Sequence, residues 1–139
     1  MPGAWDSFEL AVRAVVGQQV SVAAATTLMG RIASRFGTPI ESGDPALTHV
    51  FPTADVLRDA KIDGMPASRA TTINAIARGD FSRGVGPWTR SYIAMRSGDP
   101  DAFPEGDLVL RKVMGGNTAR AEAWRPWRAY AAILLWRSA

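Results

Sequence analysis

Apolar residues recur at α-helical spacing along most of this chain, and glycine and proline residues divide the pattern into short segments. Val22, Ala25, Met29, Ile32 and Phe36 follow the i, i+3, i+7 spacing of one buried helix face. The sequence contains no convincing alternation of apolar and polar residues of the kind that predicts strands. It therefore predicts an all-α fold.

Capping and breaking residues set the expected helix boundaries. Gly17–Val20 is typical of a tight connection between two helices, whereas residues 37–52, which include His49, predict a loop. We expect residues 1–139 to form one helical domain. The expected helices are one carrying Phe8, Val12 and Val15, then 21–36, 53–60, 66–78, 87–97, 107–114, one capped by Asn117, and 126–136.

The composition excludes several kinds of site. The chain has no cysteine, which excludes disulfides, thiolate metal sites, iron–sulfur clusters and thiol nucleophiles and fits a reducing compartment. Its one histidine, His49, is too few for most histidine-rich metal sites, so we expect no metal centre. No apolar run approaches the roughly 20 residues that span a bilayer, and no basic signal-peptide start is present. We expect an intracellular protein with no membrane partner.

Charge is distributed unevenly along the chain. Residues 1–68 carry five basic and seven acidic side chains, whereas residues 69–139 carry eleven and six. This asymmetry indicates that the second half faces a polyanion, and arginine, which supplies all but two of the basic residues, makes forked contacts with phosphate. Arginines on solvated helix faces of an arginine-rich protein would explain the charge equally well.

The sharpest local motif is Gly84-Val85-Gly86, directly before a helix that Pro87 is suited to begin. Two glycines around one apolar residue form a hairpin whose backbone can approach another chain closely. Backbone N–H groups there, and at the helix start, can hold a phosphate oxygen. The motif taken alone is also common in plain turns.

Four longer segments resemble the DNA glycosylases of the helix-hairpin-helix superfamily. GVGPWTRSYIAMR (84–96) resembles their hairpin and second helix, and FPEGDLVLR (103–111) resembles their catalytic-aspartate segment. FELAVRAVVGQQVS (8–21) and WRPWRAYAA (124–132) are similar to the first two helices and the closing helix of 3-methyladenine DNA glycosylase II. The segments occur in the family's order and cover most of the chain. The resemblance implies base excision repair of alkylated purines in double-stranded DNA, by a monomer in the bacterial cytoplasm.

By this resemblance Asp107 is the catalytic residue. It stands at the start of a predicted helix, where the helix dipole favours the ionised carboxylate. An ionised carboxylate can stabilise the oxocarbenium-like state of base release, or orient and deprotonate the attacking water. An ordinary helix-capping aspartate is the alternative.

The resemblance also places the base-binding aromatic residues at Trp88, Tyr92 and Trp136. Trp88 and Tyr92 are four residues apart and therefore share a helix face. Alkylation at N3 or N7 leaves a purine cationic, and an aromatic face attracts a cation. Core packing is the alternative role for aromatic residues at this spacing.

The expected DNA contacts lie in the hairpin and on basic residues. They are Gly84, Gly86, Thr89, Arg90 and Arg111, with Arg96, Arg125 and Arg128 as further candidate phosphate ligands. Gln19 stands where the family carries a leucine wedge, and it either fills the space of a flipped base or makes a helix-terminus hydrogen bond. The family also implies a monovalent cation on hairpin carbonyls, and we expect no other cofactor. Strand-cleaving relatives carry a lysine at the position of Trp88, so no lyase activity is expected.

Two departures from the family pattern bear on the fold. Only residues 79–83 separate the preceding helix from Gly84, whereas the family has another helix in this interval. The segment 61–66 is also a few residues shorter than its counterpart in the family. Either this first hairpin helix has been lost or part of the natural chain is missing from the sequence, and we favour the second. No segment of the sequence resembles the family's amino-terminal α/β domain either, which is consistent with a fragment of a larger protein. The rival functions are a non-catalytic DNA- or damage-binding module and a helical protein-interaction domain.

Overall fold

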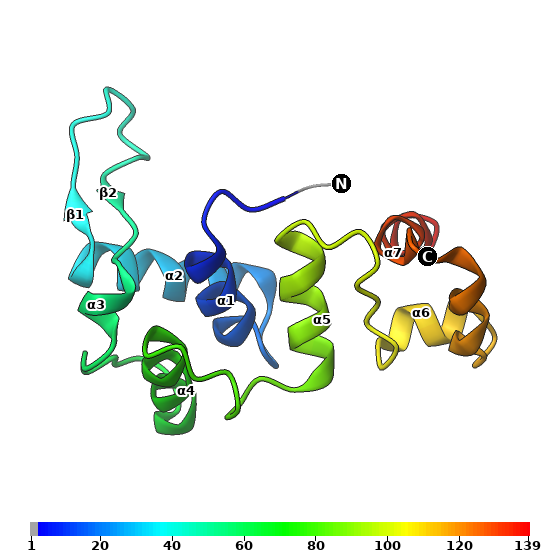
Figure 1. Cartoon of the computed structure of the whole chain (residues 1–139). Helices are drawn as coiled ribbons and strands as arrows, with labels where there is room; N and C mark the ends of the chain where they lie inside the picture. The colour runs from blue at the N-terminus through cyan, green and yellow to red at the C-terminus, as the bar shows by residue number, and fades with distance from the viewer. Residues whose placement is uncertain (1–2) are drawn as a thin grey trace. The chain divides into compact units, whose positions relative to one another are not determined.

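The computed structural model describes residues 3–139 and confirms the all-α class (Figure 1). A two-residue antiparallel strand pair is its one departure among these residues. The chain divides into an N-terminal unit, Phe8–Gly84, and a C-terminal unit, Val85–Ala139 with the residues up to Ser7. The elements are α1 (Ser7–Val16), α2 (Val22–Phe36), β1 (Thr38–Pro39), β2 (His49–Val50), α3 (Ala54–Leu57), α4 (Ala67–Ala77), α5 (Pro87–Arg96), α6 (Leu108–Val113), the 3₁₀ helix η1 (Thr118–Trp124) and α7 (Arg128–Arg137).

The first two helices form as their apolar stripes predict. Val12 and Val15 of α1 are fully buried, and α2 buries Ala25, Met29 and Ile32. The Ser21 hydroxyl accepts a hydrogen bond from the Ala24 amide and caps α2, as expected. Val22, which the stripe placed inside, is 85% exposed because it stands in the first turn, before the buried face begins.

The segment after α2 differs from the expected loop and eight-residue helix. Thr38 pairs with Val50 and Pro39 with His49, so His49 lies in a strand too short for alternation to reveal. Helix α3 ends at Leu57 rather than continuing to Ala60. The Asn74 side chain of α4 donates to the Leu57 and Ala60 carbonyls at 2.6 and 3.1 Å, which satisfies the helix end and the turn beyond it.

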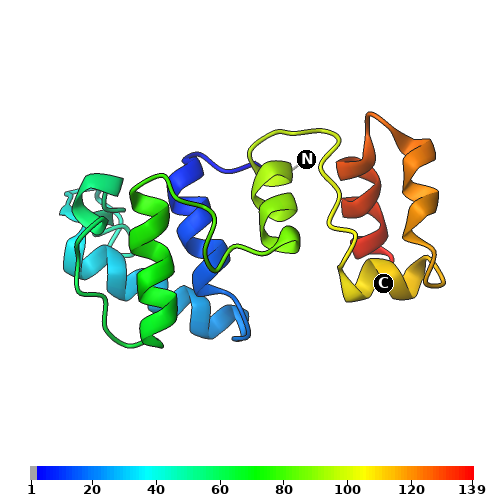
Figure 2. The ribbon, with the colours of Figure 1, turned by 60° about the horizontal axis from the view of Figure 1, so that its bottom comes forward.

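The C-terminal unit is built on a cluster of buried apolar side chains from α5, α6, α7 and the segments between them. Figure 2 shows α7 beside η1, with α6 running across their ends. Asn117 makes no side-chain capping bond to a described residue, and the segment after it is a 3₁₀ helix rather than the expected α-helix. The core comprises Met95, Ala102, Phe103, Leu110, Met114, Ala121, Ala129 and Ala132.

The hairpin follows α4 directly, because within residues 3–139 no helix lies between Ala77 and Pro87. Gly84 takes the left-handed φ of +69°, and a Cβ there would lie 2.1 Å from the Thr72 hydroxyl oxygen on α4. Gly84 is therefore required for packing within the N-terminal unit. Gly86, the N-cap of α5, has a φ of −71° and no described atom within 4 Å of a Cβ position. None of the described helices is long and apolar enough to cross a membrane.

We expect Gly84→Ala to lower the free energy of unfolding by about 2–4 kcal/mol, since it combines left-handed backbone strain with overlap on Thr72. Gly86→Ala should change it by less than about 1 kcal/mol, because the gain in chain stiffness opposes a poorer N-cap. Denaturant unfolding checks both values. Adding Thr72→Ala to Gly84→Ala should recover part of the loss, and equal stabilities of the two glycine variants would contradict this packing role.

Candidate active site

Asp107 is the N-cap of α6, and three N–H donors hold its carboxylate. Oδ1 accepts from the Leu110 amide and from the Trp136 indole, each at 2.9 Å, and Oδ2 accepts from the Trp88 indole at 2.9 Å. The helix-capping interpretation of Asp107 is therefore confirmed, and the carboxylate also lies beside two of the predicted pocket residues, Trp88 and Trp136. The two indoles come from α5 and α7, so the carboxylate joins three helices of the C-terminal unit.

The hydrogen bonds keep Asp107 ionised. Partial burial raises the pKa of its carboxyl group. Hydrogen bonds from the Trp136 indole, the Leu110 amide and the Trp88 indole together lower the pKa by more than burial raises it. The pKa consequently lies below its ordinary value. At neutral pH the site presents a negative charge in a fixed orientation, which suits it to a neighbouring positive charge.

Trp88 and Tyr92 stack on successive turns of α5, with ring centroids 5.3 Å apart and planes within 8°. The guanidinium of Arg96, one turn further on, lies over the Tyr92 ring at 5.9 Å. Tyr92 therefore contacts both Trp88 and Arg96. Trp88 is 37% exposed, so this stack ends in an indole that faces outward beside Asp107. Arg96, a candidate phosphate ligand from the sequence, packs here against the Tyr92 ring.

Trp136 completes the aromatic group from α7. It is half-buried and packs against the core cluster of the C-terminal unit while its N–H edge reaches Asp107. Two of the three aromatic residues predicted to form a base pocket, Trp88 and Trp136, thus contact the predicted catalytic carboxylate, and the third, Tyr92, stacks on Trp88. The tryptophans' role as hydrogen-bond donors to that carboxylate was missed, because sequence spacing says nothing of which ring edge faces it.

The hairpin residues have distinct environments. Gly86 is exposed and unhindered, whereas Thr89 is 4% exposed, which removes its hydroxyl from the surface expected to contact DNA. Arg90 donates from Nε to the Val85 carbonyl at 2.9 Å and so braces the turn that precedes its own helix. Arg111 is exposed on α6.

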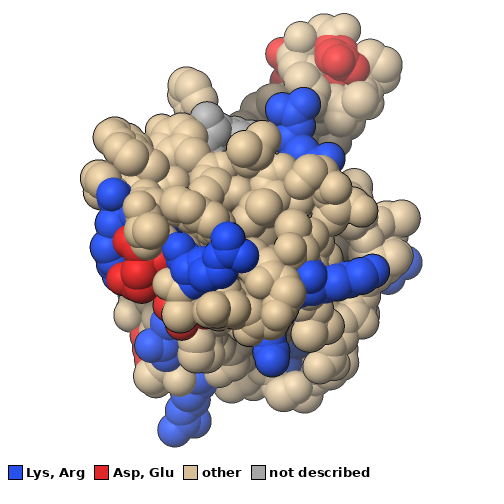
Figure 3. Space-filling view, turned by 90° about the vertical axis from the view of Figure 1, so that its right-hand side faces the viewer, with Lys and Arg blue, Asp and Glu red and all other residues tan. Residues whose placement is uncertain are grey.

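Two further candidate phosphate ligands are engaged in ion pairs. Arg128 is buried, and its guanidinium donates two hydrogen bonds to the Asp101 carboxylate, at 2.8 and 2.9 Å. It donates a third, at 2.6 Å, to the Glu122 carboxylate. Arg125 pairs with the same two carboxylates. Both arginines therefore have carboxylate partners within the C-terminal unit, a role that their candidacy as phosphate ligands did not include. The face in Figure 3 carries basic side chains in several separate places, with an acidic group beside one of them.

The Gln18–Gln19 turn of the N-terminal unit is held from two sides. Arg69 of α4 donates to the Gln18 carbonyl at 2.7 Å, and the Gln18 side chain donates to the Gly84 carbonyl at 3.0 Å. Gln19 is exposed and, among residues 3–139, is the one non-glycine with a positive φ, +57°. A positive φ is uncommon for a residue other than glycine, and backbone strain of this kind clusters at functional sites.

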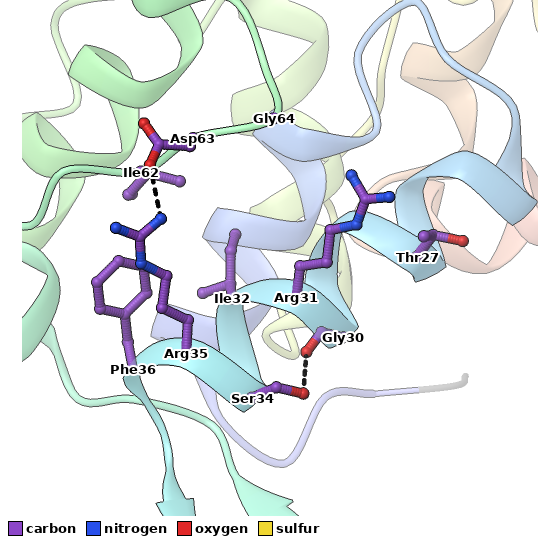
Figure 4. A pocket seen from close by; sticks show the side chains of 10 residues that line it. All are labelled: Thr27, Gly30, Arg31, Ile32, Ser34, Arg35, Phe36, Ile62, Asp63 and Gly64. Carbon is purple, nitrogen blue, oxygen red and sulfur yellow. Dashed lines mark hydrogen bonds and ion pairs between the residues drawn. The ribbon is translucent and has the colours of Figure 1, made fainter.

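An open pocket of about 670 Å³ lies elsewhere in the N-terminal unit, along the second half of α2 (Figure 4). Arg35 and Asp63 form an ion pair of 2.6 Å inside it, and Arg31 projects beside them. None of the residues predicted from the sequence to form the site lines this pocket. Among the described residues there is also no group of three or more histidine, cysteine, aspartate or glutamate side chains suited to a metal ion.

Comparison with known proteins agrees with the family resemblance. The chain is 42% identical over 171 residues to the probable bifunctional transcriptional activator/DNA repair enzyme AlkA of Mycobacterium tuberculosis, covering 98% of this chain and 34% of that protein. It is 32% identical over 168 residues to DNA-3-methyladenine glycosylase 2 of Escherichia coli, covering 98% and 59%. No family model matches the chain.

The fold has a solved counterpart. The 3-methyladenine DNA-glycosylase from Archaeoglobus fulgidus superposes with a TM-score of 0.74 at 20% identity, covering 96% of this chain and 58% of that one. This chain thus spans about a third to three-fifths of these relatives. The aligned regions are longer than its 139 residues, so the relatives have residues at positions where this chain has none.

We expect Trp88→Phe and Trp136→Phe each to raise the pKa of Asp107, because each keeps an aromatic ring but removes a donor to the ionised carboxylate. A carboxyl with a lowered folded-state pKa stabilises the fold above its unfolded-state pKa and loses that contribution as pH falls through the folded-state value. The variants should therefore lose less stability on acidification.

Carboxyl-carbon NMR titration of Asp107 measures the effect directly. Trp127→Phe is the control, since this exposed tryptophan makes its ring contact with Tyr130 rather than with Asp107. An unchanged pKa in both the Trp88 and Trp136 variants would show that the indoles do not hold the carboxylate ionised.

Proposed function

This chain is homologous over nearly its whole length to 3-methyladenine DNA glycosylases, and we propose that it excises alkylated, cationic purines from double-stranded DNA. The reaction would hydrolyse the N-glycosidic bond and leave an abasic site. The observation that carries this proposal is the ionised Asp107 carboxylate, held by the indoles of Trp88 and Trp136. We further propose that the protein acts as a monomer in the bacterial cytoplasm.

The proposed chemistry follows from the charge of the two reactants. Breaking the bond to a cationic purine leaves positive charge on the sugar, as in other glycosyl transfers. A fixed carboxylate stabilises this oxocarbenium-like state, or orients and deprotonates water for attack on it. Because three N–H donors already hold Asp107, little reorganisation would be needed as the charge develops.

The aromatic residues would select the base by charge. The indoles of Trp88 and Trp136 both border Asp107, so a purine whose sugar lies beside the carboxylate would lie against them. A cation over an aromatic face gains roughly 0.5–2 kcal/mol without any specific hydrogen bond, which implies several alkylated substrates rather than one. A target base inside a duplex must first be flipped out, and Gln19 is the residue we propose fills its place.

The proposed reaction stops at the abasic site. A lyase that cuts the strand needs an amine to form a Schiff base with the sugar. The position two residues after Gly86 is Trp88, and the only lysines in the sequence are Lys61 and Lys112. A non-catalytic DNA- or damage-binding module is the second candidate, because this chain spans only part of its relatives and lacks positions that they contain.

Asp107→Asn should lower the rate of base release from methylated duplex DNA by at least about 10²-fold, because it removes the charge that would stabilise the developing cation. Duplex binding should persist. Counting abasic sites under single-turnover conditions measures the rate. Glu105→Gln, a neighbouring exposed carboxylate, is the matched control and should leave the rate unchanged. Excision by Asp107→Asn at the normal rate would exclude Asp107 as the catalytic carboxylate, and no excision by the unaltered protein would favour the binding module.

Gly86→Ala should weaken binding to damaged and undamaged duplexes about equally, since a Cβ on the exposed hairpin obstructs approach to a phosphate without reading any base. Binding isotherms across a salt series, with a shallower slope for the variant, provide the test. Gly30→Ala is the matched control, because it also adds a Cβ in open space but lies on α2, away from the hairpin in the sequence. It should bind both duplexes as the unaltered protein does. Unchanged binding by a folded Gly86→Ala would make the hairpin an ordinary turn.

A further inference from the structure

All three backbone carbonyls of the hairpin already accept hydrogen bonds. The Gly84 carbonyl accepts from the Gln18 side-chain amide at 3.0 Å. The Val85 carbonyl accepts from Nε of Arg90 at 2.9 Å, and the Gly86 carbonyl accepts from the Arg90 backbone amide at 3.0 Å. A monovalent cation of the kind implied by the family resemblance needs such carbonyl oxygens to replace its hydration shell.

These residues do not fit a bound cation. A carbonyl oxygen has a second lone pair, so a hydrogen bond alone would not exclude one. The donor to Val85, however, is a guanidinium, which is positively charged at every pH that proteins experience. A second positive charge on the same oxygens would be repelled by it.

We propose that Arg90 supplies the positive charge at the hairpin in place of a monovalent cation, so that DNA binding does not depend on which monovalent cation is present. Arg90 is anchored to the hairpin: its backbone amide donates to the Gly86 carbonyl, and its side chain donates to the Val85 carbonyl. The charge is therefore attached to the start of α5, beside the exposed N-cap at Gly86. A phosphate at this turn would meet backbone N–H groups together with a fixed cation. This inference rests on the proposed function, because it concerns how the protein holds DNA.

The test compares dissociation constants for an undamaged duplex in potassium, sodium and tetramethylammonium chloride at equal ionic strength. Equal ionic strength removes the general salt effect on binding, and tetramethylammonium is too large for carbonyl oxygens to encircle. The unaltered protein should bind within about twofold in all three salts. Binding at least about fivefold weaker in tetramethylammonium alone would overturn the inference. Failure to bind in any salt would instead refute the proposed function, and this inference with it.

Arg90→Met removes the charge and the side-chain donor but keeps an unbranched apolar stem. In tetramethylammonium it should bind at least about fivefold more weakly than the unaltered protein, and potassium or sodium should restore part of the loss because the Val85 carbonyl is now open to a cation. Equal loss in all three salts, or no loss, would show that Arg90 does not take a cation's place. Arg120→Met on η1 is the matched control and should keep the cation independence of the unaltered protein. Circular dichroism and thermal unfolding establish that each variant is folded.

Discussion

The site depends on the three hydrogen bonds that the Asp107 carboxylate accepts. Two of them come from indoles on helices that precede and follow α6, so a single side chain ties α5, α6 and α7 together. The same bonds hold the pKa of the carboxyl group below its ordinary value against the effect of burial. Without them, burial would raise the pKa of this carboxyl group, and only its ionised form can stabilise a cation by charge. The packing of α5, α6 and α7 and the proposed chemistry thus both depend on the hydrogen bonds to this one carboxylate.

The aromatic residues serve two purposes around this carboxylate. Trp88 and Trp136 direct their polar edges to Asp107, and we propose that the ring face of Trp88 away from Tyr92 and the part of Trp136 outside the core contact the base. Tyr92 stacks on Trp88 and also contacts the Arg96 guanidinium, so it supports the position of the Trp88 indole. This division explains how a small set of aromatic residues can both hold an anion and attract a cationic base.

The sequence predicted what depends on local spacing and missed what depends on distant partners. Ser21 and Asp107 cap helices as expected, and Trp88 and Tyr92 share a helix face, because capping and i, i+4 contacts involve neighbouring residues. The burial of Thr89 and the pairing of Arg128 with Asp101, 27 residues away, depend on tertiary packing that spacing does not encode. The hairpin motif predicted that Gly84 contacts DNA. The fold shows in addition that the Thr72 side chain leaves no room for a Cβ at Gly84, which gives this glycine a packing role.

The central claim is that an ionised Asp107 drives base release, and the pH dependence of that step tests it most directly. The measurement is the single-turnover rate of release of 7-methylguanine from duplex DNA, from about pH 4.5 to about pH 8. Because the pKa of Asp107 lies below its ordinary value, the account predicts a rate that does not fall on the acid side of this range, and Trp88→Phe should move any acid limb toward higher pH. An acid limb near about pH 6 in the unaltered protein would show that the essential group is protonated there, and would contradict the account.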